Sequence, residues 1–348
     1  MTLSEYVGAM RRIVLSLGLS AALTPAALAW GFTGHELVNA AAMQRPAPGL
    51  PAFLLTSTAV GDIVALGPEL DRSKGSGKPH DPDLDPGHYV DLDDAGKVAG
   101  TVDLSAMPAT RRDYDSALRI VHTDQYTMGF LPYAIVDGWE QLRTDFAIWR
   151  IDSYGEQHAA LAEDRTAFGA DRFRREAITI HDLGIWSHYV GDGSQPLHIT
   201  IHFNGWGNYP NPNGYTTNHI HSYFESEFVT KYAKAAAVAA KIPAYTPANP
   251  TQLLTQTQIA SIVGTYLSDT AKAVGPLYTL YASGDFTNGS PKAIDFTDAQ
   301  LARGATEFRD LIALAWEDSL NAGVGYPQIP VRDIVSGKVV PTAANQTP

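Results

Sequence analysis

The sequence contains no cysteine among its 348 residues. Disulfide bonds, thiolate metal ligands and thiol nucleophiles are therefore excluded, and any metal ion must be held by imidazole nitrogens and carboxylate oxygens. Positive charge is also scarce, because 25 lysines and arginines face 37 aspartates and glutamates, for a formal net charge of -12. This balance argues against a broad basic surface for duplex nucleic acid. The 11 histidines are enough to build metal sites without sulfur.

Long apolar runs are absent beyond the N-terminus, since no stretch of about 20 apolar residues follows residue 29. Residues 1–29 contain Arg11 and Arg12, then a short apolar stretch over 13–23, then Ala27-Leu28-Ala29. This order is the layout of a secretory signal peptide with a small-x-small cleavage site. We therefore predict cleavage before Trp30, a mature chain of residues 30–348, no transmembrane span, and a secreted or periplasmic location.

Hydrophobic periodicity predicts helices through most of the chain. The predicted helices cover residues 33–45, 51–66, 112–150 with a division near Gly129 and Pro132, 154–168, the segment carrying His188, 219–240, 251–283 and 297–321. Two segments are expected to be loops: the polar stretch 73–88, and 203–214, which would present Trp206 and Tyr209 at the surface. No convincing alternating strand pattern is present. The sequence therefore predicts an all-α, single, mostly helical domain with long loops on one side.

Metal-binding side chains are concentrated in residues 181–198. His188 and Asp192 are four positions apart, so on a helix they share a face and can bind the same ion. Pro196 ends the helical pattern and turns the chain, which lets His198 approach from a different direction. The segment therefore offers three ligands at one corner of the structure.

A second pair with the same spacing is His221 and Glu225. Alone, a histidine and a glutamate on one helix face are more often a solvated pair than a metal site. Together with His198, this pair makes a set of three ligands. The other pair, His188 and Asp192, needs further ligands, which His88 and a preceding aspartate can supply. Nitrogen and oxygen ligands without sulfur are what zinc accepts in open catalytic sites.

In four places the sequence resembles a superfamily of zinc-dependent phosphoesterases, which includes single-strand-specific nucleases and bacterial zinc-dependent phospholipases C. The matching pieces follow the family's order and span residues 30–225: Trp30-Gly-x-x-Gly-His35, His88-Tyr-Val-Asp91, His188-Tyr-Val-Gly-Asp192-x-x-Gln-Pro-Leu-His198 and His221-x-x-x-Glu225. The resemblance implies a mostly helical fold whose long loops surround a cleft with three Zn²⁺ ions.

The resemblance also implies which residues hold each ion. One ion would be bound by Asp71, His88, His188 and Asp192. A second would be bound by His198, His221 and Glu225. The third would be bound by His35, a bridging oxygen of Asp192, and the α-amino and carbonyl groups of Trp30. Because an amide nitrogen has no lone pair to offer a metal, an uncleaved precursor would lack the complete third site.

The least constrained ligand is the aspartate before His88, since both Asp62 and Asp71 precede it. The family's spacing favours Asp71, which also has the basic residues Arg72 and Lys74 beside it; the family often places a basic residue near the phosphate. Asp62 would then be a helix-end or structural residue. The other histidines are expected on the surface, in the core or behind the ligands: His80, His122, His158, His181, His202 and His219. Of these, His181 is the best placed to support a ligand, because it lies seven positions before His188.

The implied activity is hydrolysis of phosphodiester bonds by a hydroxide held between two metal ions, with Asp71 and Asp192 as catalytic residues. Lys74, Tyr89 and Asp91 would bind substrate. Tyr89 would stack on a base and Asp91 would hydrogen-bond its edge, which favours a single-strand endonuclease or 3'-nucleotidase acting on single-stranded nucleic acid or nucleotides.

The alternative is a phospholipase C acting on phospholipid head groups. Glu225 supports it, because nucleases of the family usually carry an aspartate four residues after the histidine, whereas phospholipases carry a glutamate. The aromatic side chains of 203–214 could also touch a lipid surface. No protein partner is indicated by the sequence.

Overall fold

The computed structural model describes residues 30–342. The predicted signal segment, residues 1–29, lies outside the described residues. Helices dominate this part of the chain, and its strands form two small antiparallel sheets of two strands each. The prediction of a mostly helical protein is therefore confirmed. Among the described helices, none is long and apolar enough to cross a membrane.

The longer helices are α2 (Gly31–Gln44), α3 (Ser57–Leu66), α5 (Arg111–Ile120), α7 (Leu131–His158), α8 (Ala162–Asp192), α11 (Gln256–Ala271), α12 (Val274–Ala282) and α14 (Pro291–Asp318). The shorter ones are α4 (His80–Leu84), α6 (Gln125–Met128), α9 (Val229–Tyr232), α10 (Ala235–Ala240), α13 (Asp285–Asn288) and α15 (Val331–Val335). Strand β1 (Lys97–Val98) pairs with β2 (Val102–Asp103), and β3 (Gly323–Val324) pairs with β4 (Ile329–Pro330). A π-helix, η6 (Tyr223–Phe228), and the 3-10 helices η1 (Ala52–Leu55), η2 (Glu69–Ser73), η3 (Asp85–His88), η4 (Leu104–Ala106), η5 (Pro196–His198) and η7 (Ser319–Asn321) complete the list.

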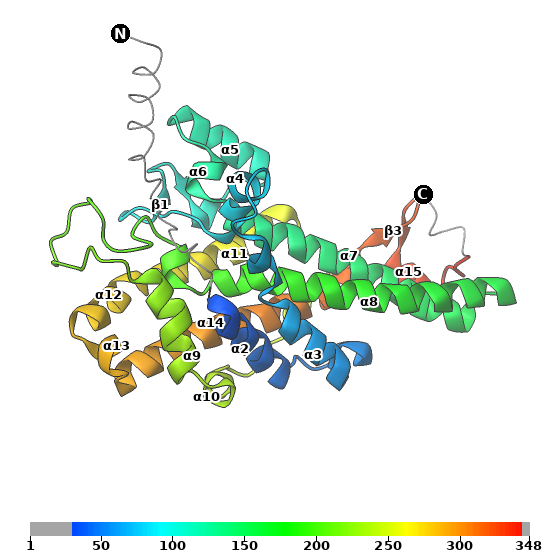
Figure 1. Ribbon diagram of the computed structural model, residues 1–348. Helices are drawn as coiled ribbons and strands as arrows, with labels where there is room; N and C mark the ends of the chain where they lie inside the picture. The colour runs from blue at the N-terminus through cyan, green and yellow to red at the C-terminus, as the bar shows by residue number, and fades with distance from the viewer. Residues whose placement is uncertain (1–29, 343–348) are drawn as a thin grey trace, which may run out of the picture.

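The long helices α7 and α8 are consecutive in the chain and lie side by side. One end of this pair projects beyond the rest of the molecule (Figure 1). The N-terminal half of α8 is largely solvent-exposed, as Phe173 shows with 73% of its side chain accessible. From Leu183 onwards the helix is almost entirely buried, where α2, α3 and α14 pack against it. The last three turns of α8 therefore lie in the centre of the protein.

Helix boundaries follow local chemistry that is legible in the sequence. Thr255 and Gln258 form a reciprocal capping box at the start of α11. Ser290 caps the N–H of Ala293 at the start of α14, with proline in the first position of the helix. These caps fix where the two long C-terminal helices begin.

Four predicted elements need correction. The predicted helix over 154–168 is wrong, because α7 continues to His158 and the chain breaks at 159–161 before α8 begins. The polar stretch 73–88 is not without helix, since it contains α4 and η3. The predicted helix over 219–240 is interrupted at Ala233, whose backbone is extended. The helix predicted over 251–283 is likewise divided, into α11 and α12.

Candidate metal centre

The buried end of α8 supplies the first two predicted ligands. His188 and Asp192 are both fully buried and lie one turn apart on the helix. His188 Nδ1 lies 2.8 Å from the backbone carbonyl oxygen of Gly67, to which it donates a hydrogen bond as an N–H group. This hydrogen bond fixes the orientation of the ring and directs Nε2 into the site. In metal-binding histidines, the ring nitrogen that does not bind the metal commonly makes such a hydrogen bond.

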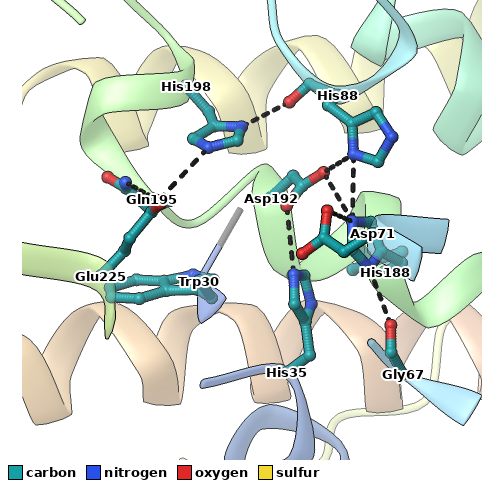
Figure 2. A network of polar contacts seen from close by, with 12 residues as sticks. Trp30, His35, Gly67, Asp71, His88, His188, Asp192, Gln195, His198 and Glu225 are labelled. Carbon is teal, nitrogen blue, oxygen red and sulfur yellow. Dashed lines mark hydrogen bonds and ion pairs between the residues drawn. The ribbon is translucent and has the colours of Figure 1, made fainter. Parts of the chain in front are cut away.

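The carboxylate of Asp192 faces two groups of histidines at once (Figure 2). Its Oδ2 lies 3.0 Å from His88 Nδ1 and 3.5 Å from His188 Nε2. Its other oxygen, Oδ1, lies 3.4 Å from His35 Nε2, whose ring stacks on that of His188. The two oxygens of one carboxylate are therefore divided between neighbouring groups, which is the arrangement that a bridging ligand requires.

Asp71 and His88 reach this site from the segment that connects α3 to the rest of the chain. Asp71 lies in η2, and its Oδ1 is 3.5 Å from His188 Nε2. His88 ends η3, and its Nδ1 is 3.0 Å from the same nitrogen. Asp62 is exposed on α3 and belongs to none of the candidate groups, so the structure brings Asp71 to the site and leaves Asp62 outside it.

The second predicted set is assembled from three elements. His198 ends η5, Glu225 lies in the π-helix η6, and His221 lies two residues before the start of η6. Glu225 Oε2 lies 2.8 Å from His221 Nε2 and 3.7 Å from His198 Nε2. His198 Nδ1 lies 2.6 Å from the carbonyl oxygen of His88, a contact that connects the two ligand sets.

Gln195 supports this second set of ligands through two hydrogen bonds, a role that the sequence alone did not indicate. Its Oε1 accepts a hydrogen bond from the N–H of Leu197, which stabilises the turn after α8. Its Nε2 donates to Glu225 Oε2 over 3.2 Å. Gln195 therefore orients the glutamate as well as the turn that carries His198.

The buried nitrogen and oxygen atoms of these residues fit a bound cation. Within residues 30–342, several ligand atoms are buried without a hydrogen bond: His35 Nε2, Asp192 Oδ1, His198 Nε2, His221 Nε2 and Glu225 Oε1. Buried polar atoms without partners are uncommon because each costs about 1–3 kcal/mol. A divalent cation between histidine nitrogens and carboxylate oxygens would satisfy them, and the ligand types, nitrogen and oxygen without sulfur, are those that zinc accepts.

Burial also shifts the pKa values of the ligands in the direction that metal binding needs. Burial lowers the pKa of His35 and His88 well below its ordinary value, so both rings are neutral and carry a lone pair. Burial raises the pKa of Asp192 well above its ordinary value, because a carboxylate is poorly stabilised there without a nearby cation. A bound divalent cation would reverse that penalty. For Asp71, burial works in the same direction, but hydrogen bonding and charge from His188, with the charge of Lys74, give a lowered pKa.

Trp30, the predicted N-terminal residue of the mature chain, is completely buried beside these ligands. Its Nε1 donates a hydrogen bond to Ser194 Oγ over 2.8 Å. Its carbonyl oxygen accepts a hydrogen bond from the N–H of Gly34 over 3.0 Å. The contacts place Trp30 against the turn after α8, and its ligation of a metal through backbone groups stays a prediction.

Gly191 lies between the two ligands of α8 and allows His35 to approach. A Cβ atom added at Gly191 would lie 2.9 Å from His35 Nδ1. That separation is too short for a normal contact, so the imidazole or the helix would have to move. The absence of a side chain at this position therefore permits the packing of α2 against the end of α8.

A pocket of about 400 Å³ opens beside the ligands, and we call it the Tyr89 pocket. Its lining residues are Lys74, Asp85, His88, Tyr89, Asp91, Thr127, Leu197, His198, Phe203 and His221. All three predicted substrate-binding residues are therefore in its wall. A larger hollow, about 710 Å³, lies between α11 and α14 and contains none of the predicted ligands.

The polar groups of the Tyr89 pocket have unusual environments. Burial raises the pKa of Asp91 to about 7, so this carboxyl titrates near neutral pH. Burial also raises the pKa of Tyr89 to about 12, so the phenol stays neutral. Lys74 Nζ lies 2.7 Å from Asp71 Oδ1, which places its positive charge between the ligands and the pocket.

Of the other histidines, His181 does not support a ligand. Its side chain is 64% exposed and contacts the neighbouring Asp182, so His181 lies at the surface, one of the places expected for the remaining histidines. His80 contacts Asp81 and Asp85 in a fourth candidate group, which is only partly buried and lies on the 73–88 segment.

The segment 203–214 differs from its prediction at one residue. Tyr209 is 46% exposed, as expected for a surface loop, but Trp206 is 8% exposed and stacks on His202. The prediction that Trp206 is presented at the surface is therefore wrong. The indole is buried because it is stacked on the imidazole and its Nε1 donates to the carbonyl oxygen of Pro210.

Comparisons with protein-family models, with curated proteins and with solved structures found no match to this chain. The family resemblance therefore depends on the four sequence motifs alone, and the structure adds the geometry in which their residues lie.

Proposed function

We propose that the chain is a zinc-dependent phosphoesterase of the superfamily that its motifs resemble, and that it cleaves phosphodiester bonds. One observation carries the proposal: Asp192 directs one oxygen toward His88 and His188 and the other toward His35, next to a pocket that contains a lysine. Neighbouring metal ions that share a carboxylate are typical of enzymes that hydrolyse phosphoesters.

The candidate ligands would hold three Zn²⁺ ions. The first ion would use Asp71, His88, His188 and Asp192. The second would use His198, His221 and Glu225. The third would use His35, Asp192 and the backbone groups of Trp30. When bound, zinc lowers the pKa of water from 15.7 toward about 7 and neutralises charge on the phosphoryl oxygens.

The chain's own residues position the substrate and balance charge. Lys74 offers a positive group at the border between the ligands and the Tyr89 pocket, where it would contact a non-bridging phosphate oxygen. Asp71, which holds Lys74, would also orient the attacking water. Since Leu197 and Phe203 make part of the wall apolar, the pocket restricts water around the scissile bond.

The favoured substrate is single-stranded nucleic acid or a 3'-nucleotide. Tyr89 offers a neutral aromatic ring in the pocket, and stacking of a base on such a ring contributes about 1–3 kcal/mol. Asp91, on the same segment, offers a carboxyl group that would hydrogen-bond the edge of the base. These two groups select a planar base with polar edges over a flexible head group.

A phospholipase C is the second candidate, and two observations favour it. Glu225 is a glutamate, as in phospholipases of the superfamily. Phe203 and Tyr209 are 49% and 46% exposed, and aromatic side chains of this kind can enter a lipid surface. In that case the Tyr89 pocket would hold a phospholipid head group.

The deciding experiment compares hydrolysis of single-stranded DNA, a 3'-nucleotide and phosphatidylcholine by the zinc-loaded protein that begins at Trp30. We expect turnover of the two nucleotide substrates. Turnover of phosphatidylcholine alone would support the second candidate, and absence of turnover with all three would refute both. Tyr89→Ala should raise KM for the nucleotide substrates more than for a phosphodiester without a base.

A secreted or periplasmic location follows if the predicted signal is cleaved before Trp30. Cleavage would then also complete the third site by freeing the amine of Trp30. We expect a chain with one extra residue before Trp30 to bind fewer zinc ions and to be largely inactive. Three zinc ions and full activity in that chain would refute the role of the amine.

A further inference from the structure

Two walls of the Tyr89 pocket are joined by backbone hydrogen bonds. The N–H of Val90 donates to the carbonyl oxygen of His198 over 2.9 Å, and the N–H of Ile201 donates to the carbonyl oxygen of Leu92 over 3.0 Å. The segment that carries Tyr89 therefore runs alongside the segment that follows His198, and both are aligned in the same chain direction.

Beyond these backbone hydrogen bonds, the same two segments are joined by a contact between the side chains of His202 and Asp94. His202 is 1% exposed, and its Nε2 lies 2.8 Å from Asp94 Oδ1. Its other ring nitrogen, Nδ1, lies 3.1 Å from the carbonyl oxygen of Trp206. Because both neighbours are oxygen acceptors, the ring makes both hydrogen bonds only when each nitrogen carries a proton. A ring in that state is positively charged, which suits the carboxylate of Asp94.

The surroundings of His202 suit a charged and immobile ring. The Trp206 ring stacks on it with a centroid distance of 3.6 Å and an interplanar angle of 11°, a geometry that favours a cation. Tyr278 donates from its hydroxyl to the carbonyl oxygen of His202 over 2.6 Å and accepts from the N–H of Gly205 over 3.1 Å. The loop on both sides of Phe203 is therefore held to α12.

Phe203 is the residue that this arrangement presents to the pocket. It directly follows His202, it is 49% exposed, and it lines the Tyr89 pocket with Tyr89 itself. An exposed aromatic ring on a firmly held backbone provides a stacking surface without the entropy cost of ordering a mobile loop.

We propose that His202 and Asp94 are positioning residues that hold Phe203 in the pocket wall, so that Phe203 and Tyr89 together bind the planar base of a nucleotide substrate. The inference rests on the proposed function and deepens it, because it names a determinant of base binding outside the metal ligands. The titratable groups that face His202 are Asp94 from the 89–103 segment, Tyr209 from its own loop and Tyr278 from α12.

The test measures kinetics of the zinc-loaded protein with a 3'-nucleotide and with ribose 3-phosphate, which lacks the base. For His202→Gln and Asp94→Asn we expect KM for the nucleotide to rise about fivefold, the effect of losing one partly exposed ion pair. For the same variants we expect unchanged kcat, unchanged zinc content and an unchanged KM for ribose 3-phosphate. Phe203→Ala should show the same pattern, and adding His202→Gln to it should change little.

His181→Gln is the matched control, because His181 also contacts an aspartate but is exposed on α8. It should leave both substrates unaffected.

Equal changes in KM for both substrates, or loss of zinc in His202→Gln, would overturn the proposal by showing a general structural role. If the protein turns over neither of these phosphomonoesters, the proposed 3'-nucleotidase activity fails, and calorimetric binding of the two compounds then decides. If His202→Gln weakens binding of the nucleotide but not of ribose 3-phosphate, this result would support the positioning role of His202 even in the absence of turnover. No preference of the unaltered protein for the nucleotide would refute the proposal.

Discussion

Two pairs of candidate ligands have the same spacing in the sequence but different supports in the structure. His188 and Asp192 lie on the buried end of α8, with His188 Nε2 3.5 Å from the nearer carboxylate oxygen. His221 and Glu225 lie on and before the π-helix η6, with 2.8 Å between the corresponding atoms. The first pair lies on a regular α-helix of 31 residues, whereas the second spans the junction between helical residues 221–222 and the 6-residue π-helix that follows them.

The difference has a consequence for how each pair is held. On α8, backbone geometry and the Gly67 contact of His188 fix the ligands, and Asp192 is divided between two groups. On η6, a side chain from elsewhere, Gln195, is needed to orient the glutamate. The α8 pair should therefore be the more central to zinc binding, and the η6 pair the more dependent on its neighbours.

Asp192→Asn should have the largest effect, because it removes a carboxylate that faces two ligand groups. We expect activity to fall by about 10³-fold or more, beyond the range seen for one electrostatic donor. Zinc content should fall at both groups. Metal analysis and kinetics would measure the two losses, and Asp62→Asn, an exposed aspartate on α3, is the control. Full zinc content in Asp192→Asn would contradict the shared role.

Glu225→Gln should have the next largest effect and should be confined to one group. We expect the loss of one zinc ion, with the others retained, and about a 10²-fold decrease in activity. Glu227→Gln, an exposed glutamate on the same π-helix, should change neither quantity. Simultaneous loss of all zinc in Glu225→Gln would show that the two sets are not independent.

Gln195→Ala should weaken the η6 set without removing a ligand. Loss of an outer hydrogen bond to a ligand typically costs about 10–100-fold in metal affinity. Competition with a chelator would measure this decrease for the most weakly bound zinc. If the affinity of every zinc ion fell equally, Gln195 would be acting through the turn after α8 and not through Glu225.

Asp91→Asn should have the smallest effect, visible in the pH dependence of stability. Burial raises the pKa of Asp91 from 3.8 to about 7. Between these values the folded protein holds a proton that the unfolded chain has released, so Asp91 destabilises the fold increasingly as the pH rises. The midpoint of thermal unfolding of Asp91→Asn, relative to the unaltered protein, should rise by a few °C between about pH 5 and about pH 8. A difference that stays constant between these pH values would contradict the raised pKa of Asp91.

The candidate ligands could be predicted because their signals are local. His188 with Asp192, and His221 with Glu225, are four residues apart, a spacing that any turn of helix brings to one side. The wider all-helical fold was also predictable from periodicity. The choice of Asp71 over Asp62 required the family's spacing, and the structure places only Asp71 near His188.

What the sequence could not show depends on distant partners. His202 and Asp94 are 108 residues apart, and nothing near either residue marks the pair. Trp206 is buried by contacts with His202, Tyr215 and Tyr278, the last of which is also distant in the sequence, so the expectation of an exposed indole was wrong for a similar reason. The π-helix η6 has no sequence signature, and the break at 159–161 falls on Ala159-Ala160-Leu161, which are good helix formers without a proline or glycine.

The close approach of His35 to Gly191 also matters for engineering the protein. Replacing a glycine inside a helix by alanine normally stabilises it by up to about 1 kcal/mol, so helix-propensity rules would select Gly191 for improvement. The added methyl group would instead push against His35 Nδ1. A variant with alanine at this position should therefore displace His35 and lose the gain in helix stability, so thermostabilisation of this protein should leave the last turn of α8 unchanged.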